Sequence, residues 1–93
     1  MTSADVTWRA DLDALTFRPK GRAGACFVHR RAFRALAGTV EGDACLEFFA
    51  EHRDAFERAA EAKIRRRSVP DGQNFHLTSR DIRRSMALPL ERS

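Results

Sequence analysis

Residues 44–67 read ACLEFFAEHRDAFERAAEAKIRRR and form the longest stretch with helical periodicity in the chain. Side chains that form one stripe recur every three or four residues: Cys45, Phe48, Phe49, His52, Phe56, Ala59, Ala60, Lys63 and Ile64. Three pairs of opposite charge lie four residues apart, and each stabilises a helix by ~0.2–0.5 kcal/mol: Arg53–Glu57, Asp54–Arg58 and Glu61–Arg65. The pattern predicts one long amphipathic helix over about Ala44–Arg67.

The residues before this helix show the period of strands. Apolar and polar side chains alternate at 6–8 and 15–17, which is typical of strands with one buried face. Residues 25–28 are apolar on both faces and favour a more central third strand. A turn rich in Gly and Pro at 19–24 predicts a hairpin between the second and third strands.

Shorter elements are expected on either side of the long helix. Residues 30–37 have the periodicity of a short helix, and residues 75–78 have the composition of a final strand. Thr78-Ser79-Arg80-Asp81 has the pattern of a capping box, in which a hydroxyl side chain precedes an acidic one by three positions. A short helix over Arg80–Met86 is therefore possible.

The order β-β-β-α-α-β predicts an α+β fold. We expect a small antiparallel sheet of three to four short strands, packed against one long amphipathic helix plus a short helix. At 93 residues the chain has the size of one domain, 1–93, with its core in about 5–82 and a C-terminal tail at 83–93. The order of the strands is left open by the sequence.

No apolar run approaches the ~20 residues that span a bilayer. Residues 1–5 (MTSAD) lack the charged and apolar regions of a signal peptide. We therefore expect a cytoplasmic protein that does not contact a membrane.

The basic charge of the chain is unevenly distributed. The 17 basic residues against 13 acidic ones give a net charge of +4, and 15 of the 17 are Arg. Residues 1–42 carry +3, residues 43–64 carry −3 and residues 65–93 carry +4. The negative segment begins the long helix and the triple Arg ends it, as the helix dipole favours. The total charge alone does not assign a function.

Five side chains could in principle ligate a metal: Cys26, His29, Cys45, His52 and His76. Cys45 and His52 are separated by a helical rise of ~10.5 Å, and no short-spaced Cys or His pair is present. The two cysteines are best explained as inert core thiols. No nucleophile motif, phosphate loop or carboxylate pair of a catalytic site is found, so we expect no enzyme, no catalytic residue, no metal and no cofactor.

Protein–protein contact is the leading functional hypothesis. Phe48 and Phe49 lie about 100° apart around a helix, so the apolar face is wider than one small sheet must cover. Together with His52 and Phe56 they are the candidate interface of a homodimer or of an unknown protein partner. The alternative is that the helix over 30–37 covers this face within one chain.

Nucleic-acid binding is the alternative function. Two arginine clusters could meet in space and contact phosphates: Arg65, Arg66, Arg67, Arg80, Arg83 and Arg84. No known helix or strand motif of nucleic-acid recognition accompanies them.

The order of the apolar motifs resembles that of a known family. These motifs are Val6-x-Trp8, Leu15-x-Phe17, Cys26-x-Val28 before a helix with Ala32, Phe49-x-x-His52-Arg53, and Phe75-x-Leu77-Thr78. Over about residues 5–82 the chain resembles the small bacterial YrdB-like proteins, a domain of unknown function (number 1488). His29-Arg30-Arg31 departs from the pattern of that family, which favours a Ser-like cap and an acidic residue there. The resemblance implies a compact α+β bacterial domain and supplies no activity, cofactor or catalytic residue.

Overall fold

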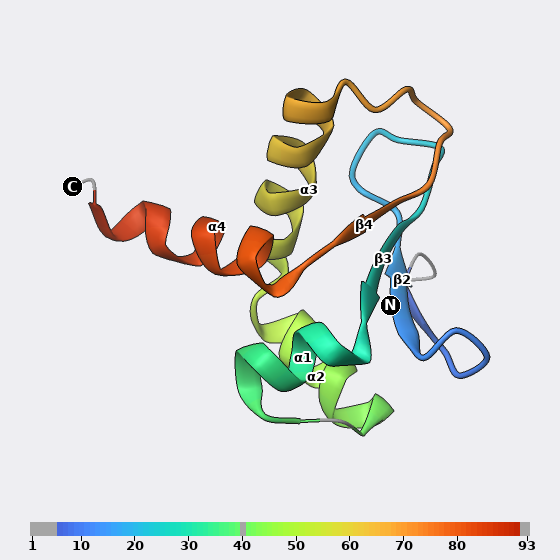
Figure 1. Cartoon of the computed structure of the whole chain (residues 1–93), viewed down its shortest axis with the longest axis vertical. Coiled ribbons are helices and arrows are strands. Elements are labelled where there is room, and N and C mark those ends of the chain that lie inside the picture. Colours follow the sequence, from blue (N-terminus) through green and yellow to red (C-terminus); the bar gives the residue numbers. More distant parts are fainter. Residues whose placement is uncertain (1–5, 40, 92–93) are drawn as a thin grey trace.

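The computed structural model describes the backbone of residues 6–39 and 41–91, with side chains as far as Met86. Its elements follow in the order β1 (Val6–Arg9), β2 (Ala14–Phe17), β3 (Cys26–His29), α1 (Arg30–Ala37), α2 (Gly42–Glu51), α3 (Arg53–Arg67), β4 (Phe75–Leu77) and α4 (Ser79–Glu91) (Figure 1). The predicted α+β class is confirmed.

The four strands form one sheet in the order β1-β2-β3-β4. β1, β2 and β3 pair antiparallel, with Leu15 opposite Trp8 on one side and Val28 on the other. β3 is an interior strand, as its apolar composition predicted. β4 pairs parallel to β3, so the expectation of an antiparallel sheet is wrong for the last strand. Three helices separate β3 from β4, and such a crossover returns the chain in the same direction.

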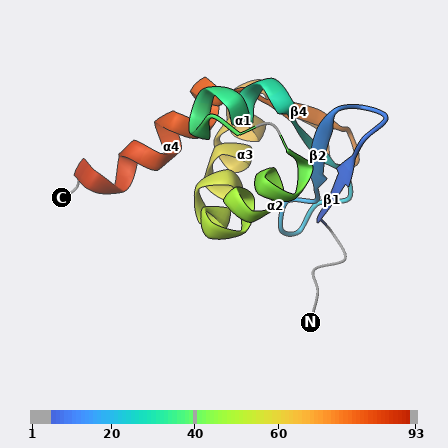
Figure 2. The same ribbon diagram turned by 90° about the horizontal axis from the view of Figure 1, so that it is seen from below.

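Helices α1, α2 and α3 lie on one face of the sheet (Figures 1 and 2). The strands turn alternate side chains toward them, because successive side chains of a strand point to opposite faces. The buried inner set is Leu15, Phe17, Cys26, Val28, Phe75 and Leu77. α4 crosses α3 and extends away from the sheet (Figures 1 and 2).

Phenylalanine rings fill the space between the sheet and the helices. Phe17 of β2 lies 4.9 Å from Phe49 and 6.5 Å from Phe56, measured between ring centroids. Phe33 of α1 stacks on Phe56 at 5.9 Å and meets Phe48 edge-on at 6.2 Å. α1 therefore covers the wide apolar face within one chain, which is the alternative that the sequence left open.

The prediction of one unbroken helix over Ala44–Arg67 is wrong. α2 begins at Gly42 and ends at Glu51, and His52, with φ −121° and ψ 28°, separates it from α3. Phe49 and Phe56 are seven residues apart, a rise of ~10.5 Å in a straight helix. Their ring centroids are nevertheless only 4.9 Å apart. The break at His52 is what allows both rings to pack on the same part of the sheet.

The predicted capping box is present at the start of α4. The Asp81 amide donates to the Thr78 hydroxyl at 3.2 Å, and the Thr78 amide donates to the Asp81 carboxylate at 2.9 Å. α4 continues to Glu91, well beyond the short helix expected over Arg80–Met86. The segment 83–93, expected as a tail, is helical as far as it is described.

Candidate functional site

Three rings lie side by side on the face of the sheet that turns away from α1, α2 and α3. Phe27 and His29 belong to β3, and His76 belongs to β4. The ring centroids of Phe27 and His76 are 5.4 Å apart, and those of His29 and His76 are 5.0 Å apart with their planes at 11°. We call Phe27, His76 and His29 the aromatic row.

Strand geometry places the aromatic row on this face. The register pairs Phe27 with His76, while their neighbours Cys26, Val28 and Leu77 point into the core. His29 and His76 are exposed and Phe27 is half-buried. Within the described part of the chain no helix covers these rings, so they are open to a partner.

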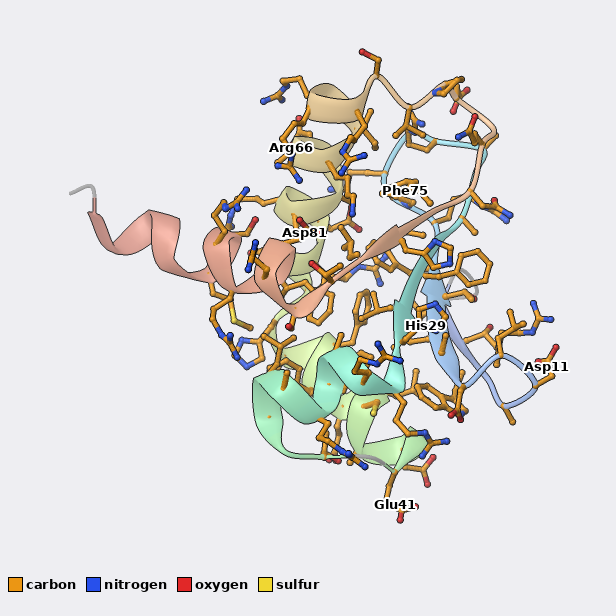
Figure 3. The ribbon with its side chains drawn as sticks, viewed as in Figure 1. Asp11, His29, Glu41, Arg66, Phe75 and Asp81 are labelled. Carbon is orange, nitrogen blue, oxygen red and sulfur yellow. The ribbon has the colours of Figure 1, made fainter. Side chains whose placement is uncertain are left out.

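A hollow of about 840 Å³ begins at the His29 end of the aromatic row, where β3 meets α1. Arg30, Arg31 and Arg34 of α1 line it together with His29, and the single acidic residue in its lining is Asp13. Ser79 at the start of α4 lines it as well. We call this the first hollow; Figure 3 shows His29 at the end of β3, where α1 begins.

Asp13 holds Arg30 in place. Its carboxylate accepts hydrogen bonds from the Arg30 side chain at 2.6 and 3.0 Å, and its carbonyl accepts the Arg30 amide at 2.9 Å. The guanidinium of Arg30 also lies 5.2 Å from the centre of the Trp8 ring. Arg31 and Arg34 are exposed and form no ion pair with any described residue, so they carry the charge that the first hollow offers to a ligand.

α4 is fixed beside this hollow by contacts to two other helices. Arg83 donates to the Ala35 carbonyl of α1 at 2.8 Å. Asp81 accepts from Lys63 at 3.0 Å and from Arg66 at 3.1 Å, both on α3 (Figure 3). Burial by itself raises the pKa of the Asp81 carboxyl, but the hydrogen bonds from Thr78 and Lys63 and the Lys63 charge outweigh burial and lower the pKa below its usual value.

A second hollow, of about 420 Å³, lies beside His76, the middle ring of the aromatic row. His76 lines it, with Lys63 and Arg67 from α3 and Gln73 from the loop before β4. Lys63 is paired with Asp81, whereas Arg67 is exposed and has no ion pair among the described residues. Two of the three rings, His29 and His76, therefore have a basic hollow beside them.

Contacts between the β2–β3 loop and the α3–β4 loop position β4 and His76. The Ala23 amide donates to Asp71 at 3.0 Å, and the Ala25 amide donates to the Asn74 side chain at 2.9 Å. The backbone of Gly24 lies so close to Gln73 that a Cβ on Gly24 would overlap the Gln73 carbonyl oxygen. Only glycine fits at this crossing without a backbone shift.

One histidine of the aromatic row, His76, has a lowered pKa. Burial lowers the pKa of the His76 imidazole, and the neighbouring His29 and Lys63 lower it further. Because this pKa lies below the usual value of ~6.5, the His76 ring is mainly uncharged at pH 7, and the arginines of the hollows supply the positive charge.

The structure places the predicted protein interface partly in the core. Phe49 and Phe56 are 2% and 0% exposed and face the sheet. Phe48 and His52 are half-buried at the edge of the core, with their rings 4.4 Å apart. An interface through these two side chains stays a prediction.

The two predicted arginine clusters are brought side by side, because Arg66 reaches Asp81 on α4. Three of the six arginines already have partners: Arg65 pairs with Glu61 at 3.2 Å, while Arg66 and Arg83 bind α4 and α1 as described. Arg80 and Arg84 are exposed on α4, and Arg67 lines the second hollow.

The remaining candidates for chemistry do not converge. Among the described residues, no three side chains of His, Cys, Asp or Glu come close enough to hold a metal ion. Cys26 and Cys45 are free and buried, and burial raises the pKa of both thiols. None of the described helices combines the length and apolar character needed to cross a membrane.

A family model described as "Protein of unknown function (DUF1488)" matches residues 5–75. The chain belongs to this family. The match confirms the family number inferred from the apolar motifs; it does not extend to the YrdB-like name. No curated protein and no solved structure matches the chain. The DUF1488 segment contains Phe27, His29 and the arginines of α1, and it ends one residue before His76.

Sequence reasoning missed the aromatic row and the arginines of the first hollow. The sequence pattern assigns Phe27 to a strand buried on both faces, and it presents His29 and His76 only as potential metal ligands. The available signal was the alternation in the strands, since Phe27, His29 and His76 all sit one position from buried residues. Pairing of β4 with β3 is what joins them.

Proposed function

We propose that this chain is a non-catalytic nucleic-acid-binding domain that contacts phosphates in its two basic hollows. The observation that carries the proposal is the lining of the first hollow, which includes Arg31, Arg34 and His29. The single acidic side chain there is already paired with Arg30. Arginine binds phosphate oxygens with a planar fork of donors, which suits such a site.

This proposal moves the contact surface away from the arginines that the sequence singled out. Arg65 and Arg66 are paired with carboxylates, which offset their charge, and Arg83 donates to a backbone carbonyl, which leaves it fewer donors for a ligand. Arg31 and Arg34 in the first hollow replace them as phosphate contacts, and Arg67 in the second hollow remains a candidate.

We keep the bacterial cytoplasm as the proposed compartment, since two unpaired thiols suit a reducing environment.

The test is salt-dependent binding of a mixed-sequence oligonucleotide to the full chain. The double variant Arg31→Gln/Arg34→Gln is expected to bind more weakly and to flatten the plot of log K against log salt concentration, by about 0.7 for each phosphate of a single strand that the variant no longer neutralises. The matched control, Arg65→Gln/Arg84→Gln, removes the same charge outside both hollows. An equal weakening in the control, or no binding by the unaltered chain at low salt, would contradict the proposal.

A second candidate function is self-association through Phe48 and His52. These two rings are in contact and half-buried beside the break between α2 and α3. A second copy that covered them would complete their burial. Light scattering at increasing protein concentration tests it: a mass that rises toward a dimer, and falls back in the variant Phe48→Ser, is expected, whereas a constant monomer mass rules it out.

A further inference from the structure

The aromatic row offers rings for stacking and the two hollows offer positive charge, and together these features suit a single-stranded nucleic acid. We propose that they bind single-stranded RNA, with bases stacked on the aromatic row and phosphates held by Arg31, Arg34 and Arg67. This inference rests on the proposed nucleic-acid function and names its substrate class.

Continuity of the surface is the first argument. His29 belongs both to the aromatic row and to the lining of the first hollow, and His76 belongs both to the row and to the lining of the second. A nucleic-acid strand that lies across the stacked rings of His29 and His76 therefore passes from one basic hollow to the other, with Phe27 beside His76 as a third ring. Proteins that bind single strands combine such a basic groove with aromatic side chains on which successive bases stack.

Ring chemistry is the second argument. Phe27 is apolar and His76 is mainly uncharged at pH 7, so both offer π faces without a competing ion pair. Bases inside a duplex are already stacked on one another and their faces are out of reach. Rings on an open sheet face therefore favour unpaired bases over duplex.

The polar groups beside the rings favour RNA over DNA. Ser79 lines the first hollow and Gln73 lines the second, next to the arginines that would hold the backbone. A hydroxyl and a carboxamide can each donate to or accept from the ribose 2′-hydroxyl, the group that distinguishes RNA from DNA.

An apolar protein partner suits the surface less. Leu12 is the one large hydrophobic residue that is exposed among those described, and it lies on the turn between β1 and β2.

Fluorescence anisotropy with a labelled single-stranded RNA of about 12 nucleotides, within the ~4–16 nucleotides typical of such sites, tests the proposal. The variants Phe27→Ala and His76→Ala are expected to weaken binding by roughly 5- to 100-fold each, with the salt dependence unchanged. The control is Thr7→Ala, which lies exposed on β1 at the far edge of the same sheet and is expected to bind like the unaltered chain.

The outcomes separate this inference from the proposed function. If Arg31→Gln/Arg34→Gln loses binding while both ring variants keep it, stacking on the aromatic row is wrong and phosphate binding stands. If no probe binds at low salt, both proposals fail. Duplex RNA bound as tightly as the single strand, or single-stranded DNA bound as tightly as RNA, overturns the named substrate class. If Phe27→Ala folds poorly, His76→Ala still tests the proposal. His76 is exposed on an edge strand, so we expect its removal to leave the fold intact.

Discussion

The two faces of the sheet are made from the same strands and have opposite properties. Phe17, Val28 and Leu77 on the inner face are almost fully buried under three helices. Phe27, His29 and His76 on the outer face alternate with residues of that set and remain wholly or partly exposed. The inner side chains exclude water and hold the fold together, whereas the outer rings contribute little to burial and are available to a ligand.

The comparison is tested most strongly by removing one ring from the core that covers the inner face and one ring from the outer face. Phe56→Ala empties a site that is 0% exposed and contacts four other phenylalanines, so we expect the free energy of unfolding to fall by ~3–5 kcal/mol. Phe27→Ala removes a half-buried ring, and we expect a loss of no more than ~1 kcal/mol. Urea denaturation followed by circular dichroism measures both. Equal losses would mean that the two faces do not differ as described.

Gly24→Ala tests whether the outer face depends on the two interlocked loops. The added Cβ overlaps the Gln73 carbonyl and forces the loop before β4 to move, which we expect to cost ~1–3 kcal/mol. Thermal unfolding gives the loss of stability. Gly72→Ala is not a suitable control, because Gly72 has φ +92° and any side chain there is strained. The control is therefore Ala23→Gly, and a melting temperature of Gly24→Ala no lower than that of this control would contradict the close approach.

Asp81→Asn tests how α4 is held beside the first hollow. The substitution weakens the ion pairs to Lys63 and Arg66 and the helix cap, and we expect a loss of ~1–2 kcal/mol at pH 7. Glu61→Gln breaks an exposed pair with Arg65 and is expected to cost less than ~0.5 kcal/mol.

The contribution of Asp81 depends on pH. Because folding lowers the pKa of its carboxyl, the stabilisation is complete above the unfolded value of ~3.9 and is lost as the pH falls through the lower folded value. The unaltered chain and Asp81→Asn should therefore approach each other in stability below about pH 4. A difference that is the same at pH 3 as at pH 7 would show that the charge of Asp81 is not what stabilises α4.

His76→Gln gives the smallest expected effect on stability. Folding lowers the pKa of the imidazole, so between the folded value and the unfolded value of ~6.5 the unfolded chain binds more protons. The stability of the unaltered chain should therefore fall as the pH is lowered from 7 to 5, and the variant should lose less over that interval. Melting curves across this range provide the measurement, and parallel pH profiles would show that His76 does not titrate in this way.

Local patterns in the sequence predicted the local parts of the fold. Alternation identified the first two strands, a short apolar run identified β3 and its interior position, and the Thr78–Asp81 spacing identified the start of α4. The break at His52 was missed because the stripe of Phe48, Phe49 and Phe56 keeps helical spacing on both sides of it. Periodicity over many residues does not reveal a single residue whose backbone dihedral angles are not helical.

The candidate site depends on contacts between distant segments, which explains why the sequence did not predict it. His76 meets His29 and Phe27 only because β4 pairs parallel to β3 in one register. A shift of one residue would turn His76 into the core and Leu77 outward. Asp13 is likewise far from Arg30 in the chain, so the pair that leaves Arg31 and Arg34 to a ligand could not be anticipated.

An NMR titration of the full chain with single-stranded RNA, observing amide and imidazole signals, tests the division between the two faces most directly. The account predicts that the signals of Phe27, His29 and His76 move on binding, together with those of Arg31 and Arg34. Signals of inner residues such as Ala59, and of the Phe48–His52 pair on the helical side, should stay in place. No change at low salt, or changes confined to Phe48 and His52, would contradict it.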